Sequence, residues 1–337
     1  MHKPTDARPP RYRAVITGTG SSVPGRVLTN DDLATMVETS DEWITTRTGI
    51  KTRRVTTDQE STATLSIEAA KRALADARVQ ACDVDLIVVA TVTPEVVLPA
   101  TACFVQEGIG ASNAWGFDLA AACSGFVYAL YTAQQFVESG QVHRALVIGA
   151  ETLTKITNWK DRASCILFGD GAGAAVLERS EDPDRGLLYS TVGMDGAGWE
   201  SLLCQAYGSR YPASRPLDDP NRIYISIRGR EVYQQAVRRI VESVTHCMEA
   251  CGLTTDQVDL LIPHQMNARI IESVAKRLDL PDHKVFVNID RYGNTSAASV
   301  PIALDECRRT GRVKQGDRVI LVAFGAGITW GANVVRL

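Results

Sequence analysis

Three residues of the 337-residue sequence have side chains and surroundings suited to covalent catalysis, namely Cys123, His264 and Asn294. Small residues flank the cysteine in the run Asp-Leu-Ala-Ala-Ala-Cys-Ser-Gly-Phe, and apolar residues then recur at helical spacing. This pattern predicts a helix that begins at Cys123. Because a helix N-terminus favours a thiolate, we expect it to lower the pKa of Cys123 and make the sulfur a nucleophile. The alternative is a small buried core cysteine.

His264 and Asn294 occupy the positions where side chains of α/β proteins often do chemistry. His264 ends the apolar run Leu-Leu-Ile-Pro, which predicts a place at the carboxyl edge of a strand, where open α/β sheets bind their ligands. Asn294 stands in Gly-Asn-Thr-Ser-Ala-Ala-Ser, at the start of an expected helix. Each residue also has a simpler interpretation, a satisfied core histidine and a helix N-cap. Together with Cys123 they form a candidate catalytic set.

An internal repeat predicts how these residues are positioned. In both halves an apolar strand, a helix, a glycine-led helix start and a second apolar strand follow one another in the same order. Val258 lies 174 positions after Val84, and Thr310 lies 171 positions after Ser139. The second offset places Asn294 opposite Cys123. We therefore expect two similar halves whose helix starts meet.

The order of elements indicates an α/β fold of two matched units. Helices that alternate with fully apolar strands are typical of sheets covered by helices on both faces. We expect an N-terminal half at 12–182, which holds the cysteine, and a C-terminal half at 223–337, which holds the histidine and the asparagine. The segment 183–222 is expected to be a linker with a surface loop. Its part Gln205–Arg222 either shapes substrate access or only decorates the surface.

Composition excludes several classes of function. Apolar residues make up 45% of the chain, charged residues 22%, and the net charge is −3. These values predict a folded domain with no general attraction for nucleic acid or for a membrane surface. The longest apolar run, Leu119–Ala133, is too short to span a bilayer, and the polar residues 1–13 resemble no export signal, so we expect a cytoplasmic protein. The eight cysteines show no CxxC spacing, which argues against disulfides and zinc.

The motifs around the three candidate residues resemble those of the β-ketoacyl-acyl-carrier-protein synthase III family. The resemblance extends from Arg13 to Leu337 and includes the segments Ser40–Ile50, Phe168–Ala175 and Phe324–Gly331. It implies the thiolase fold, with five layers in the order α/β/α/β/α, and a homodimer. This fold agrees with the duplicated halves inferred from the repeat.

The resemblance also implies an acyltransferase reaction, a decarboxylative Claisen condensation that initiates fatty acid biosynthesis. Cys123 would take an acyl group from coenzyme A, and malonyl-acyl-carrier protein would then lose CO2 and attack the thioester. His264 and Asn294 would stabilise the enolate. The backbone N–H groups of Cys123 and Ala326 would form the oxyanion hole. Neither a metal nor a cofactor is implied, since coenzyme A enters as the thioester substrate.

Further residues are assigned to substrate contacts. Trp43 and Arg47 are four positions apart, which places them on one helix face, where a surface stack is the simpler interpretation. With Arg162 and Asn267, the resemblance makes them coenzyme A contacts. Leu98 falls where some members place an aromatic residue that narrows the acyl pocket. A wider pocket for branched or longer acyl groups is our hypothesis.

A basic stripe follows the histidine. Arg269, Lys276 and Arg277 lie at positions i, i+7 and i+8 of one expected helix in an otherwise acidic protein. A solvated helix face is one interpretation. The place beside His264 favours docking of the acidic carrier protein.

Three other functions compete with this one. A family relative of secondary metabolism would condense other acyl groups or transfer an acyl chain to an alcohol. A Cys-His hydrolase would release acid without malonate, and a scaffold would catalyse nothing. The combination of Cys123, His264 and Asn294 favours condensation, because simple acyl transfer needs no enolate stabiliser.

Overall fold

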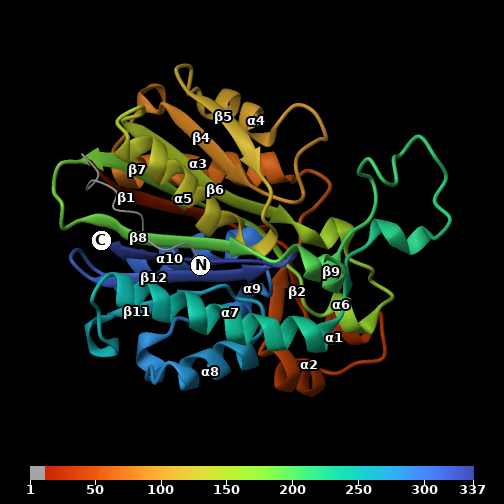
Figure 1. Ribbon diagram of the computed structural model, residues 1–337. Helices are drawn as coiled ribbons and strands as arrows, with labels where there is room; N and C mark the ends of the chain where they lie inside the picture. Colours follow the sequence, from red (N-terminus) through yellow and green to blue (C-terminus); the bar gives the residue numbers. More distant parts are fainter. Residues whose placement is uncertain (1–11) are drawn as a thin grey trace.

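The computed structural model describes residues 12–337, which form alternating layers of helices and sheets (Figure 1). The expectation for the polar tail therefore falls mostly outside the described residues. None of the helices in residues 12–337 is both long and apolar enough to cross a membrane. All eight cysteines lie in the described part and are free thiols.

The first sheet has five strands in the order β1-β7-β6-β4-β5. β4 runs parallel to both of its neighbours, while β7 is antiparallel to β6 and β1. Every residue of β4 is buried, as its uninterrupted apolar run predicts for a strand covered on both faces. The strands are β1 (Arg13–Ser22), β4 (Leu86–Ala90), β5 (Trp115–Leu119), β6 (Arg144–Thr152) and β7 (Asp170–Ser180).

The second sheet has four strands in the order β11-β12-β13-β8. Its strands are β8 (Gly186–Met194), β11 (Leu260–Pro263), β12 (Arg318–Gly325) and β13 (Thr329–Arg336). The presence of β8 corrects one expectation, because it lies inside the segment 183–222 that we predicted to be a linker. It pairs with β13 and adds the fourth strand of this sheet, so that β13 is not left as an edge strand.

The internal repeat is visible in the two sheets, with a constant offset of 174 residues. β4 and β11 begin 174 positions apart, and so do β6 and β12. The same offset relates two short 3-10 helices, Ala122–Ser124 and Ser296–Ala298, so Ala297 is the counterpart of Cys123. The prediction that Asn294 is that counterpart was wrong. The offset of 171 arose because α10 (Ser299–Arg309) has 11 residues and α5 (Gly125–Glu138) has 14.

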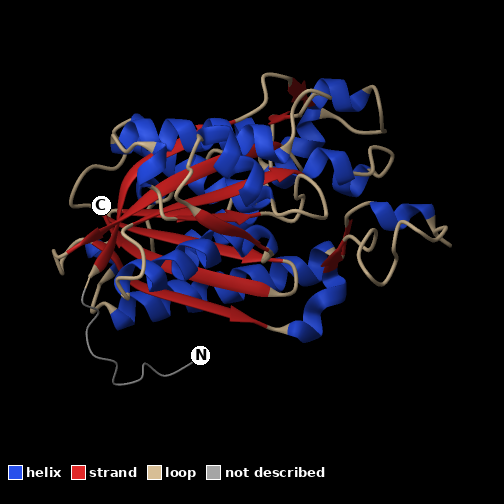
Figure 2. Ribbon diagram, turned by 90° about the horizontal axis from the view of Figure 1, so that it is seen from above, coloured by secondary structure: helices blue, strands red, loops and turns tan. Residues whose placement is uncertain are grey.

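Helices form three further layers around the sheets. α5 and α10 lie between the two sheets, and their apolar faces share one core with both of them. α3 (Thr62–Ala77) and α4 (Thr101–Ile109) cover the outer face of the first sheet. α7 (Gly229–Ala250) and α8 (Ala268–Arg277) cover the outer face of the second. Figure 2 shows helices packed around the strands. The three shared cores give the expected order α/β/α/β/α.

A smaller unit lies beside the ends of the strands and is built around a buried arginine. Arg53 is fully buried and donates hydrogen bonds to the carbonyls of Leu28 and Ile166 and to Oδ1 of Asn30. Burial lowers the pKa of this guanidinium to about 10. The unit comprises β2 (Val27–Thr29), β3 (Thr52–Arg54), α1 (Asn30–Ala34), α2 (Asp41–Thr48), α6 (Arg162–Cys165) and α9 (Ile289–Tyr292).

The expected surface loop projects from the molecule next to this unit (Figure 1). Two short strands, β9 (Leu202–Leu203) and β10 (Ser226–Ile227), pair at its base. Within the loop Arg222 pairs with Asp218 at 2.8 Å and lies over the ring of Tyr211 at 4.3 Å. The loop therefore has internal contacts of its own.

Candidate active site

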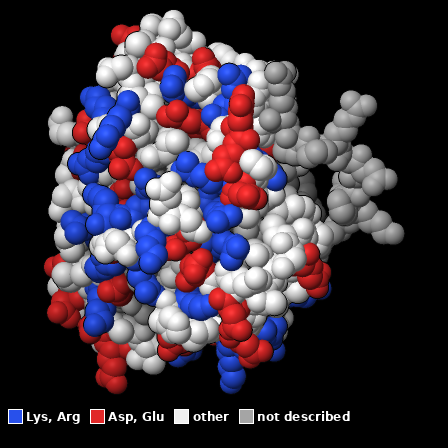
Figure 3. All heavy atoms as spheres, turned by 90° about the vertical axis from the view of Figure 1, so that its left-hand side faces the viewer, with Lys and Arg blue, Asp and Glu red and all other residues white. Residues whose placement is uncertain are grey.

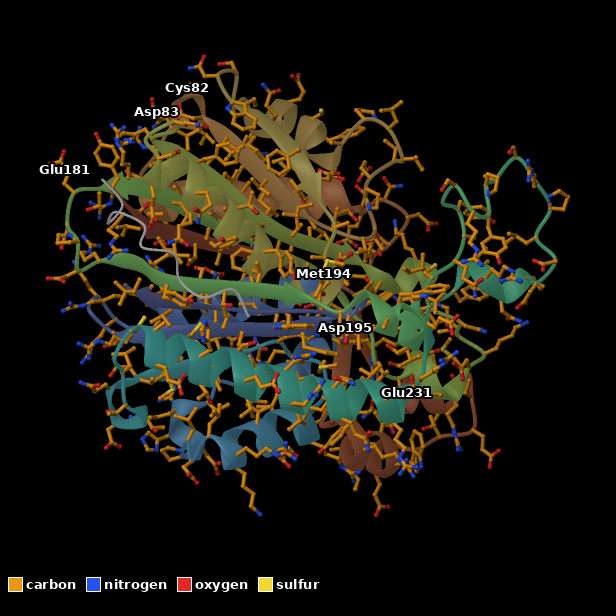
Figure 4. The ribbon with its side chains drawn as sticks, viewed as in Figure 1. Cys82, Asp83, Glu181, Met194, Asp195 and Glu231 are labelled. Carbon is orange, nitrogen blue, oxygen red and sulfur yellow. The ribbon has the colours of Figure 1, made fainter. Side chains whose placement is uncertain are left out.

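The candidate residues meet at one end of the two sheets. β4 and β6 are parallel, as are β11 and β12, and the carboxyl ends of these strands face the same side. Met194 and Asp195, labelled in Figure 4, mark the end of β8 on this side. Cys82 and Asp83 lie away from it, beyond the first sheet. The edge therefore belongs to both halves, as the repeat predicted.

Cys123 lies in a tight turn that faces the end of β12. The preceding Ala122 has a left-handed φ of 47°, and Cys123 itself is only 8% exposed. A Cβ atom at Gly325 would come within 2.8 Å of the Cys123 nitrogen, so only glycine permits this approach. Within residues 12–337, the N–H groups of Cys123 and Ala326 donate to no backbone group outside their own elements. Both remain suitable for an oxyanion.

The expected lowering of the Cys123 pKa was wrong. Burial raises the pKa of this thiol to about 12, although a hydrogen bond with Ser296 opposes the shift. The cysteine precedes the regular helix α5, which begins at Gly125, and lies in a 3-10 turn away from water. The loss of hydration therefore raises the pKa of the thiol more than the helix terminus lowers it. The sulfur must lose a proton when it attacks.

His264 is held in one orientation by Ser299. The Oγ atom of Ser299 lies 2.6 Å from Nδ1 of His264 and also accepts a 3.5 Å hydrogen bond from the Gln265 N–H. A hydroxyl that accepts from Gln265 can donate its own proton to Nδ1, which leaves the ring proton on Nε2. Nε2 is buried and has no partner among the described residues. Burial lowers the pKa of His264 to about 3, so the ring is a neutral donor.

Asn294 is fixed by a local turn. Its Oδ1 atom accepts a 2.8 Å hydrogen bond from the N–H of Ser296. The carbonyl oxygen of the amide is thus used, and the NH2 group is left to donate elsewhere. The alternative of a helix N-cap was wrong, because Thr295 is the N-cap of the turn Ser296–Ala298. Because Ser296 also hydrogen-bonds Cys123, the asparagine and the cysteine share one neighbour. His264 joins them through Ser299, one turn further along.

Glu151 is a residue of the site that the sequence analysis missed. It lies at the end of β6, fully buried, and accepts a 3.2 Å hydrogen bond from Oγ of Ser296. Burial raises the pKa of Glu151 to about 7. A signal was present, because an acidic residue directly after an apolar strand, at the same sheet edge as His264, is unusual in a core.

The candidate nucleotide contacts come together as predicted. The guanidinium groups of Arg47 and Arg162 each lie 4.6 Å from the centre of the Trp43 ring. Arg162 also donates a hydrogen bond to the carbonyl of Glu38 at 3.0 Å. An aromatic ring with two cations beside it can hold a planar base and its phosphates.

The residues after His264 attach the helix α8 to α2 and form its exposed basic face. Asn267 caps α8 and donates to the Arg47 carbonyl at 3.1 Å, while Arg269 donates from Nε to the Thr46 carbonyl at 3.0 Å. These bonds join α8 to α2. Lys276 and Arg277 end α8 and are exposed, so the predicted basic stripe does lie on one helix.

Leu98 does not line a pocket in a single chain. Its side chain is 85% exposed, on the loop between β4 and α4. An enclosed acyl pocket would bury it. Leu98 can act in such a pocket only if a second molecule covers this loop.

The arrangement is suited to chemistry on a thioester. It offers one thiol, two backbone N–H groups beside it, and two neutral side-chain donors from the other half. Within residues 12–337, no group of three or more His, Cys, Asp or Glu residues is arranged to hold a metal ion.

Family models, a curated relative and a solved structure all match this chain under the name of one family. Family models described as 3-oxoacyl-[acyl-carrier-protein (ACP)] synthase III match residues 117–196 and, for the C-terminal part, residues 248–337. The β-ketoacyl-[acyl-carrier-protein] synthase III of Caldanaerobacter subterraneus subsp. tengcongensis is 54% identical over 97% of this chain and 98% of its own. The crystal structure of 3-oxoacyl-[acyl-carrier-protein] synthase III from Aquifex aeolicus VF5 has a TM-score of 0.90 and 46% identity, covering 96% of this chain and 100% of its own.

A second similar structure is that of a priming β-ketosynthase. The priming β-ketosynthase of the R1128 polyketide biosynthetic pathway has a TM-score of 0.91 and 36% identity, covering 99% of both chains. Both solved structures therefore have the same overall fold as this chain.

The orientation of His264 can be tested by exchanging Ser299→Ala. We expect the native ring to carry its proton on Nε2 and to stay neutral from pH 8 down to pH 5, because its pKa is lowered to about 3. Loss of the Ser299 hydrogen bond, at about 0.5–1.5 kcal/mol, should weaken the preference for this tautomer by roughly 2- to 10-fold. Nitrogen-15 NMR of the ring measures both quantities.

A His264→Gln variant assigns the ring signals in that experiment. An imidazole that gains a proton between pH 8 and pH 5, or that carries its proton on Nδ1 in the native protein, would contradict the proposed orientation.

Proposed function

The chain belongs to the β-ketoacyl-acyl-carrier-protein synthase III family, the acyltransferases that start fatty acid biosynthesis by condensation, and we propose that Cys123, His264 and Asn294 perform this reaction. The observation that carries the assignment is the convergence of the three residues on Ser296 and Ser299, at an edge shared by both halves. The substrates we propose are an acyl-CoA and malonyl-acyl-carrier protein. We also propose a cytoplasmic location.

In the first step the sulfur of Cys123 attacks the carbonyl carbon of the acyl-CoA. The negative charge on the carbonyl oxygen is stabilised by the N–H groups of Cys123 and Ala326. Removal of one such donor typically lowers the rate by ~10²–10³-fold. The resulting thioester divides one difficult reaction into two easier ones.

In the second step the malonyl group loses CO2 and forms an enolate. Nε2–H of His264 and the NH2 group of Asn294 donate to the enolate oxygen, and the enolate carbon attacks the Cys123 thioester. Because CO2 is the leaving group, no strong base is needed. A neutral imidazole is well suited to this role, since it donates a hydrogen bond without binding the malonyl carboxylate as a counter-ion.

We propose that coenzyme A binds over the unit that holds Trp43. In the structure Arg162 rests on the Trp43 ring, where it can move aside and pack on the opposite face of an adenine. Arg47 then pairs with the phosphates. Asn267, at the start of α8, lies between this unit and His264, which suits a contact with the pantetheine arm.

The carrier protein is proposed to dock on α8 through Arg269, Lys276 and Arg277. A second basic surface lies at the opposite end of the sheets, where Figure 3 shows many Lys and Arg side chains. Lys314 and Arg185 line a hollow at that end. That end is separated from the site by the length of β6, nine residues or roughly 30 Å. Since α8 begins four residues after His264, it offers the shorter path for the malonyl thioester.

We propose a homodimer formed by the exposed edge of the first sheet. β5 is the edge strand, and Trp115, 48% exposed, lies there with Phe117. An unpaired strand with aromatic residues is a ready surface for pairing with a second copy. The adjoining loop carries Val97 and Leu98, so the same contact would place Leu98 in the partner's acyl pocket.

A second candidate function is priming of a polyketide rather than of a fatty acid. The similarity to the R1128 priming ketosynthase supports it, because the two chains match over 99% of their length. The two functions use the same steps and differ in the preferred acyl group. A comparison of acyl-CoAs therefore bears on both.

The acylation step is tested by mixing the protein with a panel of acyl-CoAs and weighing it intact. We expect wild-type protein to gain the mass of one acyl group, and Cys123→Ser to be acylated at least 10²-fold more slowly. Acetyl-CoA and isobutyryl-CoA should load at initial rates within about 5-fold, because no aromatic residue stands at position 98. A strict acetyl preference would refute the wide pocket, and an adduct elsewhere would refute the nucleophile.

The two docking surfaces can be separated by paired variants. Lys276→Glu should raise KM for malonyl-acyl-carrier protein by roughly 5- to 10-fold and leave acylation by acyl-CoA unchanged. Trp43→Ala should raise KM for acyl-CoA and leave KM for malonyl-acyl-carrier protein unchanged. Both effects are read from initial rates at several substrate concentrations.

Lys314→Glu, which makes the same charge change at the opposite end, is the matched control and should alter neither KM. Equal effects of Lys276→Glu and Lys314→Glu would show that only the overall charge matters, contrary to docking on α8.

The dimer is tested through Leu98. Light scattering should give twice the chain mass of 36.5 kDa. Leu98→Phe should slow loading of isobutyryl-CoA by about 10-fold and that of acetyl-CoA by no more than 2-fold, since overfilling a pocket costs ~1–3 kcal/mol. Val97→Phe, the neighbouring exposed position, is the control. A monomer, or equal effects of the two variants, would contradict the shared pocket.

A further inference from the structure

Glu151 is buried beside the nucleophile without a cationic partner in residues 12–337. Five groups donate hydrogen bonds to its carboxylate: the Oγ1 atoms of Thr91 and Thr93, the N–H groups of Val92 and Thr93, and the Oγ atom of Ser296. The shortest, from Thr93 Oγ1, is 2.6 Å. These donors stabilise a charged carboxylate inside the protein, although no ion pair compensates its burial.

Ser296 connects this carboxylate to the nucleophile. Its hydroxyl donates to Oε1 of Glu151 at 3.2 Å. The turn Ser296–Ala298 packs against the turn Ala122–Ser124, and the Ser296 side chain lowers the pKa of the Cys123 thiol. The backbone of Ser296 has a left-handed φ of 47°, an unusual conformation for serine that aims the hydroxyl between the two groups. A hydroxyl can accept one proton and donate another at the same time. The three residues thus form a continuous path.

We propose that Glu151 and Ser296 form a proton relay, which takes the proton from the Cys123 thiol during acylation and returns it to the sulfur after condensation. This inference rests on the proposed function and adds the proton path that the reaction needs. Glu151 does not touch the substrate. It acts through Ser296, by holding the proton that Cys123 gives up.

The chemistry of the neighbouring groups supports the relay. Burial raises the pKa of the Cys123 thiol to about 12, so the sulfur requires a proton acceptor. His264 is a poor one, because its pKa is lowered to about 3. The pKa of Glu151, raised to about 7, lies between these values and near neutral pH, where a proton acceptor is most effective.

The proton balance closes over one cycle. In acylation the S–H bond of Cys123 breaks while the sulfur bonds to the acyl carbon. Ser296 receives this proton and passes its own to Oε1 of Glu151. The bond between the acyl carbon and the CoA sulfur breaks, and the CoA thiolate takes a proton from water. In condensation the Cys123 sulfur is released as a thiolate, and the proton of Glu151 returns to it through Ser296.

The relay also removes a charge at the useful moment. After acylation Glu151 is neutral, so the malonyl carboxylate enters a site without a buried like charge. Among the described residues, Cys123 is a titratable group that interacts with Glu151. The loop after β4 and the turn at Ser296 present hydroxyl and amide groups to the carboxylate. Glu95, on that loop, is instead bonded to the N–H of Ala63 at 2.8 Å.

Proton uptake during acylation tests this inference. Wild-type protein is mixed with acetyl-CoA at pH 7.5 in weak buffer with an indicator dye, and the acyl adduct is weighed in parallel. We expect at least half a proton to be taken up per acyl group, and none by Glu151→Gln. Wild-type acylation should become faster as the pH rises through about 7, because burial raises the pKa of Glu151 to about 7 and the relay needs its carboxylate form. Glu151→Gln should be ~10²-fold slower, without that rise.

Two further variants guard against a merely structural effect. Ser296→Ala interrupts the path and keeps Glu151, so it should also slow acylation by ~10²-fold; it serves as well if Glu151→Gln does not fold. Glu138→Gln is the matched control, because burial also raises the pKa of Glu138, which is bonded to Gln134 at 2.9 Å on α5. It should leave rate and proton uptake unchanged.

The possible failures are distinguishable. An acyl adduct on wild-type Cys123 without proton uptake would overturn the relay and leave the proposed function intact. Acylation at the wild-type rate in Ser296→Ala would do the same. Absence of any adduct in wild-type protein would overturn the proposed function and the relay together.

Discussion

The exclusion of water from the edge where the two sheets meet determines the protonation of every group in the site. Burial keeps Cys123 a thiol, keeps His264 a neutral imidazole and brings the pKa of Glu151 near 7. In water a glutamate would be almost fully ionised at pH 7, and the pKa values of a cysteine and a histidine would lie much closer to that pH. The same burial strengthens the hydrogen bonds that orient the donors, because a low local dielectric favours them. Catalytic geometry and proton control thus have one physical cause.

This exclusion depends on very close packing between the halves. A Cβ at Gly149 would lie 2.2 Å from the carbonyl oxygen of Ala297, and one at Gly125 would lie 3.2 Å from the Cβ of Ala297. Only glycine allows the Ser296–Ala298 turn to approach the first sheet and α5 so closely. The short turn can then place Ser296 against both Cys123 and Glu151.

The sequence predicted the parts of the fold that depend on local patterns. The apolar run of β4 and the spacing of Trp43 and Arg47 each determined a structure that needs few distant contacts. β8 was missed because its exposure is intermediate along much of its length, which gives no strong period, and because its partner β13 lies far away in the sequence.

The candidate site was predicted in its residues more fully than in its electrostatics. Motifs identified Cys123, His264 and Asn294, whose approach to shared neighbours requires the whole fold. The pKa of Cys123 was mispredicted, since a helix start is visible in a sequence and the depth of burial is not. Glu151 lacked any motif around it. Its importance arises from Ser296, a residue 145 positions away.

The repeat explains why such a relay can exist at all. Ala122 and Ser296 are counterparts in the two halves, and both have a left-handed φ of 47°. A left-handed backbone conformation is unfavourable in free energy for any residue other than glycine. Close packing between the halves offsets this cost. In the first half the residue after this strained position is Cys123, and in the second half the strained residue itself carries the hydroxyl. One copy of the turn therefore presents the sulfur, and the other presents the group that moves its proton.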